Sequence, residues 1–182
     1  MQYLIISGSL SKSSRSRELA NSAFEILKKN NQSVQFLDLQ KTALPPCDGD
    51  SSYSDPMVLQ VKKQIKLAKG ILIASPIYNY DVNSAVKNLV ELTGQAWREK
   101  VVGFMCAAGG KSSYMSIMPF ANSLMLDFRT VIIPRFVFAT GSSFSDNTII
   151  DTEILSRIEE LTSTLKWFTE GLFNSALQTK QK

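Results

Sequence analysis

The residues best suited to chemistry form a hydroxyl-rich loop near the start of the chain, between an apolar run at 4–6 and a helical pattern that opens at Glu18. The loop contains Ser9, Ser11, Ser14, Arg15, Ser16 and Arg17. At the start of a helix, free backbone N–H groups and aligned peptide dipoles favour an anion, and hydroxyl and guanidinium groups add further hydrogen bonds. The loop therefore predicts a phosphate site, although a plain N-capping loop would show similar residues.

This loop lacks the signatures of two common phosphate-binding loops. The pattern G-x-G-x-x-G, typical of dinucleotide-binding folds, is absent from it, and so is the G-K-[ST] ending of a P-loop. The loop therefore favours one phosphate over a pyrophosphate. Either Arg15 or Arg17 could supply a charge-assisted hydrogen bond to that phosphate.

A second stretch with unusual chemistry follows an apolar run at 71–74. Its residues are Ser75, Pro76, Ile77, Tyr78, Asn79, Tyr80 and Asp81. The tyrosines offer aromatic faces, and the asparagine amide and the backbone can bond to the polar edge of a flat heterocycle. A surface turn with two half-buried tyrosines would give the same pattern, so this stretch alone does not decide between them.

A third stretch, after the apolar run at 101–106, has almost no side chains: Ala107, Ala108, Gly109 and Gly110. Glycines here allow a ligand ring to approach backbone N–H groups closely, or they permit a tight turn with positive φ. A helix is expected directly after the second glycine. Taken together, the three stretches favour a planar cofactor that carries one phosphate, and FMN fits that description.

The elements that must position these stretches alternate along the chain. Apolar strand patterns cover 2–7, 34–39, 71–74, 101–106 and 130–138. Helical periodicity follows each of them, most clearly at 154–172. Five such units predict an α/β fold, a doubly wound sheet of five parallel strands in the order 2-1-3-4-5 with helices on both faces. We expect one domain at 1–174 and a polar tail at 175–182.

In such a sheet a ligand binds outside the carboxyl ends of the strands, where the strand order reverses. The loops after the first, third and fourth strands meet there, and these are the three stretches described above. Pro134 interrupts the last apolar strand and cannot donate a ladder hydrogen bond. That strand is therefore expected at a sheet edge or with a bulge.

Composition narrows the chemistry further. The chain of 182 residues has no histidine and two cysteines, which excludes Ser-His-Asp and Cys-His catalysis and argues against a metal centre. Its net charge of +4 suits an anionic small ligand, and its lysine pairs form no basic stripe for nucleic acid. Because no apolar run is long enough to span a membrane, we expect a cytoplasmic protein without membrane or nucleic-acid partners. Difficult chemistry would then belong to a bound organic cofactor.

Three motifs resemble the NADPH-dependent FMN reductase family of flavodoxin-like proteins. They are Gly8-Ser9-Leu10 with Ser14 and Ser16, the segment 75–80, and Ala85-Val86-Lys87-Asn88. The resemblance extends over nearly the whole chain and implies a flavodoxin-like fold. It also implies an FMN-dependent NAD(P)H oxidoreductase, in which a hydride from NADPH or NADH passes through bound FMN to a quinone, free flavin or similar small acceptor. A homodimer or a dimer of dimers is implied as well.

By this resemblance, the phosphate contacts fall at Ser9, Ser11, Ser14 and Ser16, and the flavin-ring contacts fall at 76–80 and 108–110. Two departures from the family pattern stand out. The family often has an arginine where this chain has Ser11, so Lys12 or Arg15 would supply the countercharge. Ile77 and Tyr80 replace the usual acidic residue and glycine, which changes the pocket for the acceptor but not the flavin site.

Two alternatives remain open from the sequence. One is a flavodoxin-like electron carrier that binds FMN but has no NAD(P)H activity of its own. The other is a phosphate-sensing or scaffold protein without flavin, in which the aromatic stretch at 75–80 would have no purpose. No pair of basic residues is placed clearly enough to decide between NADH and NADPH.

Overall fold

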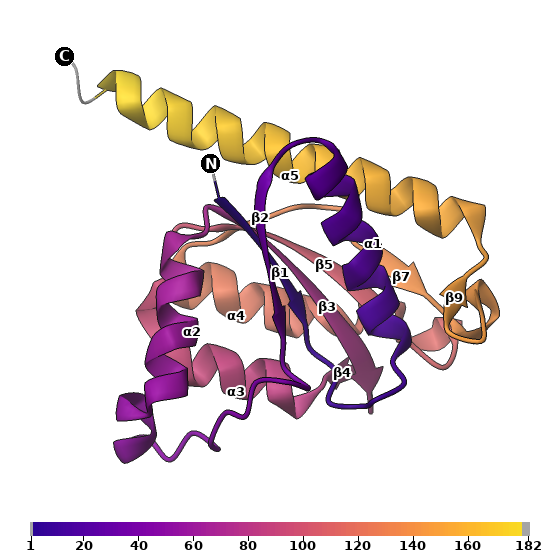
Figure 1. The fold of residues 1–182 in the computed structure, drawn as a ribbon, viewed down its shortest axis with the longest axis horizontal. Coiled ribbons are helices and arrows are strands. Elements are labelled where there is room, and N and C mark those ends of the chain that lie inside the picture. Colours follow the sequence, from indigo (N-terminus) through magenta and orange to yellow (C-terminus); the bar gives the residue numbers. More distant parts are fainter. Residues whose placement is uncertain (1, 180–182) are drawn as a thin grey trace.

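The computed structural model describes residues 2–179, with side chains up to residue 173. Its centre is a parallel sheet in the order β2-β1-β3-β5-β6, and β7 also pairs with β5 (Figure 1). The bounds of these strands are β1 (Gln2–Ser7), β2 (Ser33–Asp38), β3 (Gly70–Tyr78), β5 (Val101–Ala107), β6 (Val131–Ile132) and β7 (Val137–Ala139). The predicted doubly wound α/β class is confirmed. The strand order differs from 2-1-3-4-5 in two details: the last strand is split into β6 and β7, and a short antiparallel strand is added to β3.

Helices cover both faces of the sheet (Figure 1). One face carries α1 (Arg15–Lys29) and α5 (Thr152–Thr179), and the other carries α2 (Pro56–Leu67), α3 (Ser84–Thr93) and α4 (Met118–Phe128). The described residues also form short 3-10 helices, which are η1 (Ser51–Ser54), η2 (Gly94–Trp97), η3 (Lys111–Ile117) and η4 (Gly141–Ser143). This layering creates a separate hydrophobic core on each side of the sheet.

The first strand shows why the strand patterns are apolar at every position. Leu4 and Ile6 pack in the core beneath α2, α3 and α4, whereas Tyr3 and Ile5 pack in the core beneath α1 and α5. All four side chains are at most 1% exposed. A parallel strand covered on both faces has no solvent side, so polar alternation is lost. The carboxyl ends of these strands lie along one edge of the sheet, where the three stretches begin.

Pro134 lies at the edge of the sheet, as predicted. It falls in the gap between β6 and β7, both of which pair with β5 in parallel. The ladder continues just before the gap, where the Ile133 backbone N–H donates to the Val102 carbonyl at 2.8 Å. Proline has no N–H to continue that ladder, so the strand breaks here and resumes at Val137.

The second stretch is more regular than expected. The strand predicted to end at residue 74 continues to Tyr78 and turns back into β4 (Asp81–Val82), which pairs with it in antiparallel fashion. Asn79 and Tyr80 form the two-residue turn, with φ of 50° and 60°. Positive φ at both central positions is typical of the type I′ turn that joins tight hairpins.

The α-helix predicted directly after Gly110 begins later than expected. The 3-10 helix η3 comes first, with non-helical angles at Ser113, and α4 starts only at Met118 with Pro119 in its first turn. Proline is well accommodated in the first turn of an α-helix, because no hydrogen bond is lost there. The N-terminus of α4, with its helix dipole, is therefore separated from the third stretch by η3.

At the other end of the chain, α5 continues to Thr179, so most of the expected tail at 175–182 belongs to this helix. Residues 180–182 lie outside the described residues. In the part of the chain that the structure describes, no helix has both the length and the apolar character needed to cross a membrane.

Candidate functional site

The three stretches converge on one cavity of about 330 Å³ at the carboxyl edge of the sheet. Of the predicted site residues, the cavity is lined by Ser9, Ser11, Ser14, Arg15, Ser16, Pro76, Ile77, Tyr78, Ala107, Ala108 and Gly109. Asn79, Tyr80 and Gly110 do not line it. Ser13 and Asn147 line it as well, and sequence reasoning missed both.

In the first loop, several backbone carbonyls accept hydrogen bonds from side chains, whereas several backbone N–H groups have no partner among the described residues. Side chains donate to the backbone carbonyls of Gly8, Ser9, Ser11, Lys12 and Ser13. Within residues 2–179, no hydrogen bond uses the backbone N–H groups of Lys12, Ser13, Ser14, Arg15 or Ser16. The loop thus offers several unpaired N–H donors next to the first turn of α1. Such an arrangement suits an anion.

The serine hydroxyls are held in fixed positions. Ser14 is the N-cap of α1, and its Oγ accepts from the Arg17 backbone N–H at 3.2 Å. The hydroxyl oxygens of Ser14 and Ser16 lie 3.0 Å apart in a buried contact. Since this contact needs only one of the two hydroxyl hydrogens, the other stays available to a ligand. Ser9 Oγ accepts from the Ser11 backbone N–H at 3.2 Å, so its hydrogen is free as well.

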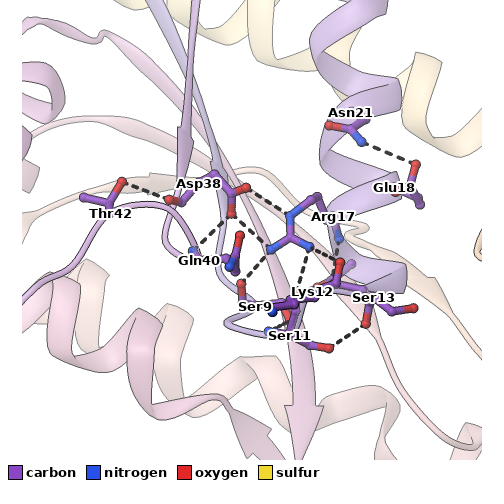
Figure 2. A network of polar contacts seen from close by, with 12 residues as sticks. Ser9, Ser11, Lys12, Ser13, Arg17, Glu18, Asn21, Asp38, Gln40 and Thr42 are labelled. Carbon is purple, nitrogen blue, oxygen red and sulfur yellow. Dashed lines mark hydrogen bonds and ion pairs between the residues drawn. The ribbon is translucent and has the colours of Figure 1, made fainter.

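The two arginines of the loop have different environments. Arg15 is exposed, lines the cavity and makes no ion pair among the described residues; its guanidinium lies 5.8 Å from the centre of the Phe144 ring. Arg17 is bound to the carboxylate of Asp38 instead, as Figure 2 shows. Lys12 does not line the cavity. Of the cations considered from the sequence, Arg15 is therefore the one placed to face a bound anion.

The third stretch leaves open space that the protein does not need. A Cβ atom added to Gly109 or Gly110 would meet no atom within 4 Å. Gly110 is extended, with φ of −153°, and Gly109 is not in the left-handed region either. Neither glycine is therefore required by a turn or by packing. Gly8 is the opposite case, because its Cβ would lie 2.3 Å from Val86 Cγ2.

The rim of the cavity is built by two hairpins. The Tyr80 hydroxyl, in the β3–β4 hairpin, donates to Ser112 Oγ at 3.3 Å and links the second stretch to η3, which follows the third stretch. Asn147 lies in the turn between β8 (Phe144–Ser145) and β9 (Thr148–Ile149), with φ of 63°. Its Nδ2 donates to Ser13 Oγ at 2.6 Å. The Asp146-Asn147 dipeptide, between Phe144–Ser145 and Thr148–Ile149, was a sequence signal for this second hairpin, because both residue types tolerate positive φ.

The chain provides little reactive chemistry of its own. The structure groups no three metal-ligating side chains together among its described residues. Burial raises the pKa of the Cys106 thiol to about 12, so this cysteine is not a nucleophile at neutral pH. The arrangement can bind and orient an anionic, planar ligand, and any redox step needs a cofactor.

A doubly wound sheet with an anion-binding loop at the point where the strand order reverses defines a nucleotide-binding protein of the flavodoxin-like class. More specifically, the chain belongs to the NADPH-dependent FMN reductase family, whose sequence profile matches residues 1–144. This confirms the resemblance inferred from the sequence motifs.

Known relatives agree with this family. The chain is 31% identical over 132 residues to the NAD(P)H-dependent FAD/FMN reductase of Geobacillus thermodenitrificans, covering 70% of this chain and 71% of that protein. It is 28% identical over 162 residues to the NAD(P)H:quinone oxidoreductase of Solanum tuberosum, covering 83% and 84%. Among solved structures, the flavoenzyme NAD(P)H:(acceptor) oxidoreductase of Paracoccus denitrificans superimposes with a TM-score of 0.75 at 18% identity, covering 93% and 97%. That likeness concerns the fold.

Proposed function

We propose that this protein is an FMN-dependent NAD(P)H oxidoreductase that reduces a quinone, free flavin or similar small acceptor. The observation that carries this proposal is the polarity of the first loop, because residues 13–16 have free backbone N–H groups and line the cavity that the second and third stretches also line. FMN, when bound, would supply the redox chemistry, since it can accept a hydride from a nicotinamide and return the electrons to an acceptor. Relatives named as FMN and quinone reductases support this assignment.

The residues present fit FMN in both of its parts. The phosphate would be held by the free N–H groups of the first loop, by Arg15 and by the hydroxyls of Ser9, Ser14 and Ser16. The Ser11 hydroxyl, which donates to the Ser13 carbonyl at 2.7 Å, would join them only by giving up that bond. The ring would lie between Pro76, Ile77, Tyr78 and the backbone of Ala107, Ala108 and Gly109. Asn79, Tyr80 and Gly110 would be reached only by a ligand that extends beyond the cavity. We assign no acid–base residue, because the protein's part is binding and orientation.

Three further proposals follow, of which the first rests on the family and the other two on the sequence. We propose a homodimer or dimer of dimers, a cytoplasmic location, and a flavin-binding domain at residues 1–174. Sedimentation velocity of the purified protein tests the first of these. A sedimenting species of monomer mass at micromolar concentration would contradict it.

The function is tested with protein purified without added flavin. We expect a yellow protein with a flavin spectrum, which oxidises NADPH or NADH when menadione is added. An electron carrier would bind flavin but consume no nicotinamide without a partner reductase. Protein that neither carries nor takes up FMN would contradict the assignment altogether.

A further inference from the structure

We propose that Arg17 and Asp38 form a positioning pair, which shapes the first loop for the FMN phosphate without touching that phosphate. This inference rests on the proposed function, because the ligand it concerns is FMN. It assigns a role to an arginine that the sequence had offered as a direct phosphate contact. All five N–H donors of the Arg17 guanidinium are used within the protein.

The guanidinium lies between a carboxylate and the loop (Figure 2). Arg17 Nε donates to Asp38 Oδ2 at 3.1 Å, and Nη2 donates to Oδ1 at 3.2 Å. On the loop side, Nη1 donates to the carbonyl of Ser11 at 2.8 Å and to that of Lys12 at 3.3 Å, and Nη2 donates to that of Ser9 at 3.1 Å. One planar group thus connects the end of β2 to three peptide units of the loop.

Peptide geometry turns these contacts into a consequence for the ligand. In a trans peptide the carbonyl of one residue and the N–H of the next point in opposite directions. When the carbonyls of Ser11 and Lys12 point at Arg17, the N–H groups of Lys12 and Ser13 must point away from it. Those two N–H groups are among the free donors of the loop. Ser13 lines the cavity, so by holding the Lys12 carbonyl Arg17 orients a backbone donor that an anion there would use.

The charge of Arg17 is already balanced. Its side chain is 13% exposed and that of Asp38 is 9% exposed, so the pair is largely removed from water. Asp38 is itself held in place, because Oδ1 accepts from the Gln40 backbone N–H at 3.1 Å and its carbonyl accepts from Thr42 Oγ1 at 2.9 Å. The loop is consequently fixed to the neighbouring strand before any ligand arrives. Arg15, which lines the cavity, is left to supply the countercharge.

The test replaces both charges at once, because removing one would leave the other buried without a partner. The double variant Arg17→Gln with Asp38→Asn keeps the net charge, and an asparagine oxygen can still accept from Gln40. A glutamine amide has two N–H donors in place of five and cannot serve three carbonyls and the side chain at position 38. We expect the dissociation constant for FMN to rise about tenfold or more, and that for riboflavin to change less than about twofold. Flavin fluorescence quenching measures both.

The control is Glu153→Gln with Arg157→Gln, which removes a more exposed arginine–carboxylate ion pair from the first turns of α5, away from the cavity. We expect it to leave both dissociation constants unchanged. The single variant Arg17→Lys keeps the charge but loses the planar fork, and we expect it to weaken FMN selectively as well. Circular dichroism monitors folding in each case.

Equal weakening of FMN and riboflavin would overturn the proposal, because it would mean that the pair supports the fold in general. An unchanged preference for FMN in both Arg17 variants would overturn it too, and so would loss of folding in both. Failure of the proposed function would look different. The unmodified protein itself would then bind no flavin, or would bind FMN no more tightly than riboflavin.

Discussion

The side-chain amide of Asn83 donates to the backbone carbonyl of Gly8 at 2.6 Å and joins the first loop to the start of α3. Ser75 Oγ donates to Asn83 Oδ1 at 3.1 Å, so the same side chain also holds the second stretch. Asn83 is 6% exposed. Two of the three loops around the cavity therefore share one buried amide, and their spacing depends on it.

We predict that Asn83→Ala weakens flavin binding and lowers the free energy of unfolding by about 1–3 kcal/mol, because the Gly8 carbonyl loses its donor in a buried position. Asn88→Ala is the matched control. That asparagine, also on α3, bonds the backbone of Pro45 and Cys47. It should lower stability without changing FMN affinity. Urea unfolding and FMN titration of both variants separate the two effects. Equal FMN affinity in both would contradict a role for Asn83 in spacing the loops.

A second prediction concerns the phosphate. FMN should bind at least about tenfold more tightly than riboflavin, because each charge-assisted hydrogen bond contributes about 1.5–3 kcal/mol. Arg15→Gln should reduce that preference, since Arg15 lines the cavity, whereas Lys12→Gln changes the net charge equally at a residue outside it. Fluorescence titrations at two salt concentrations measure both. A larger loss of FMN preference in the Lys12 variant would contradict this prediction, because it would show that Lys12, not Arg15, supplies the countercharge.

The different roles of Arg15 and Arg17 show where sequence reasoning ends. The hydroxyl-rich loop could be predicted because its residues are contiguous and lie between a strand and a helix. Side chains two positions apart on an α-helix point about 200° away from each other around the helix axis, so the two arginines face different surroundings. Which of them faces the ligand depends on Asp38, which the parallel pairing of β1 and β2 places at the carboxyl edge of the sheet beside Ser7. No local pattern contains that information.

The hairpins illustrate the same limit. Continuous apolar runs predicted the main strands, because burial on both faces leaves a strong signal in the sequence. The turn at Asn79 and Tyr80 is different, since tyrosine seldom adopts positive φ and gives no turn signal. Asn147 reaches the cavity from a position 134 residues beyond its partner Ser13. This contact depends on the path of the chain after β7, which places the β8–β9 hairpin beside the first loop.

A third prediction uses the buried lysine at the opposite edge of the sheet. Lys100 is 6% exposed and donates to the Lys66 carbonyl at 2.8 Å. Burial, together with the charges of Lys69 and Lys66, lowers the pKa of Lys100 to about 8 from 10.5. Between these two pH values the unfolded chain binds more protons than the folded chain, so the free energy of unfolding rises with pH.

Comparison with Lys100→Met isolates this effect. The free energy of unfolding of the unmodified protein minus that of the variant should rise by on the order of 2–3 kcal/mol as the pH increases from about 8 to about 10.5. Exposed Lys63→Met, on α2, corrects for the general loss of a positive charge. Urea unfolding across this pH range provides the measurement. A difference that stays flat would show that Lys100 keeps its ordinary affinity for the proton.

The last prediction concerns the open space beside Gly109. A Cβ atom added there meets no atom within 4 Å, and the backbone is outside the left-handed region, so we expect Gly109→Val to leave the fold intact. Because Gly109 lines the cavity and belongs to the stretch assigned to the ring, the added isopropyl group should displace the ring itself. FMN and riboflavin should therefore lose affinity equally, by about tenfold or more. The Arg15 and Arg17 variants of the first loop should instead weaken FMN selectively. Gly110→Val is the matched control, since its Cβ also meets open space but lies outside the cavity. Circular dichroism and titration with both flavins measure the result, and normal binding of both flavins by the Gly109 variant would place the ring elsewhere.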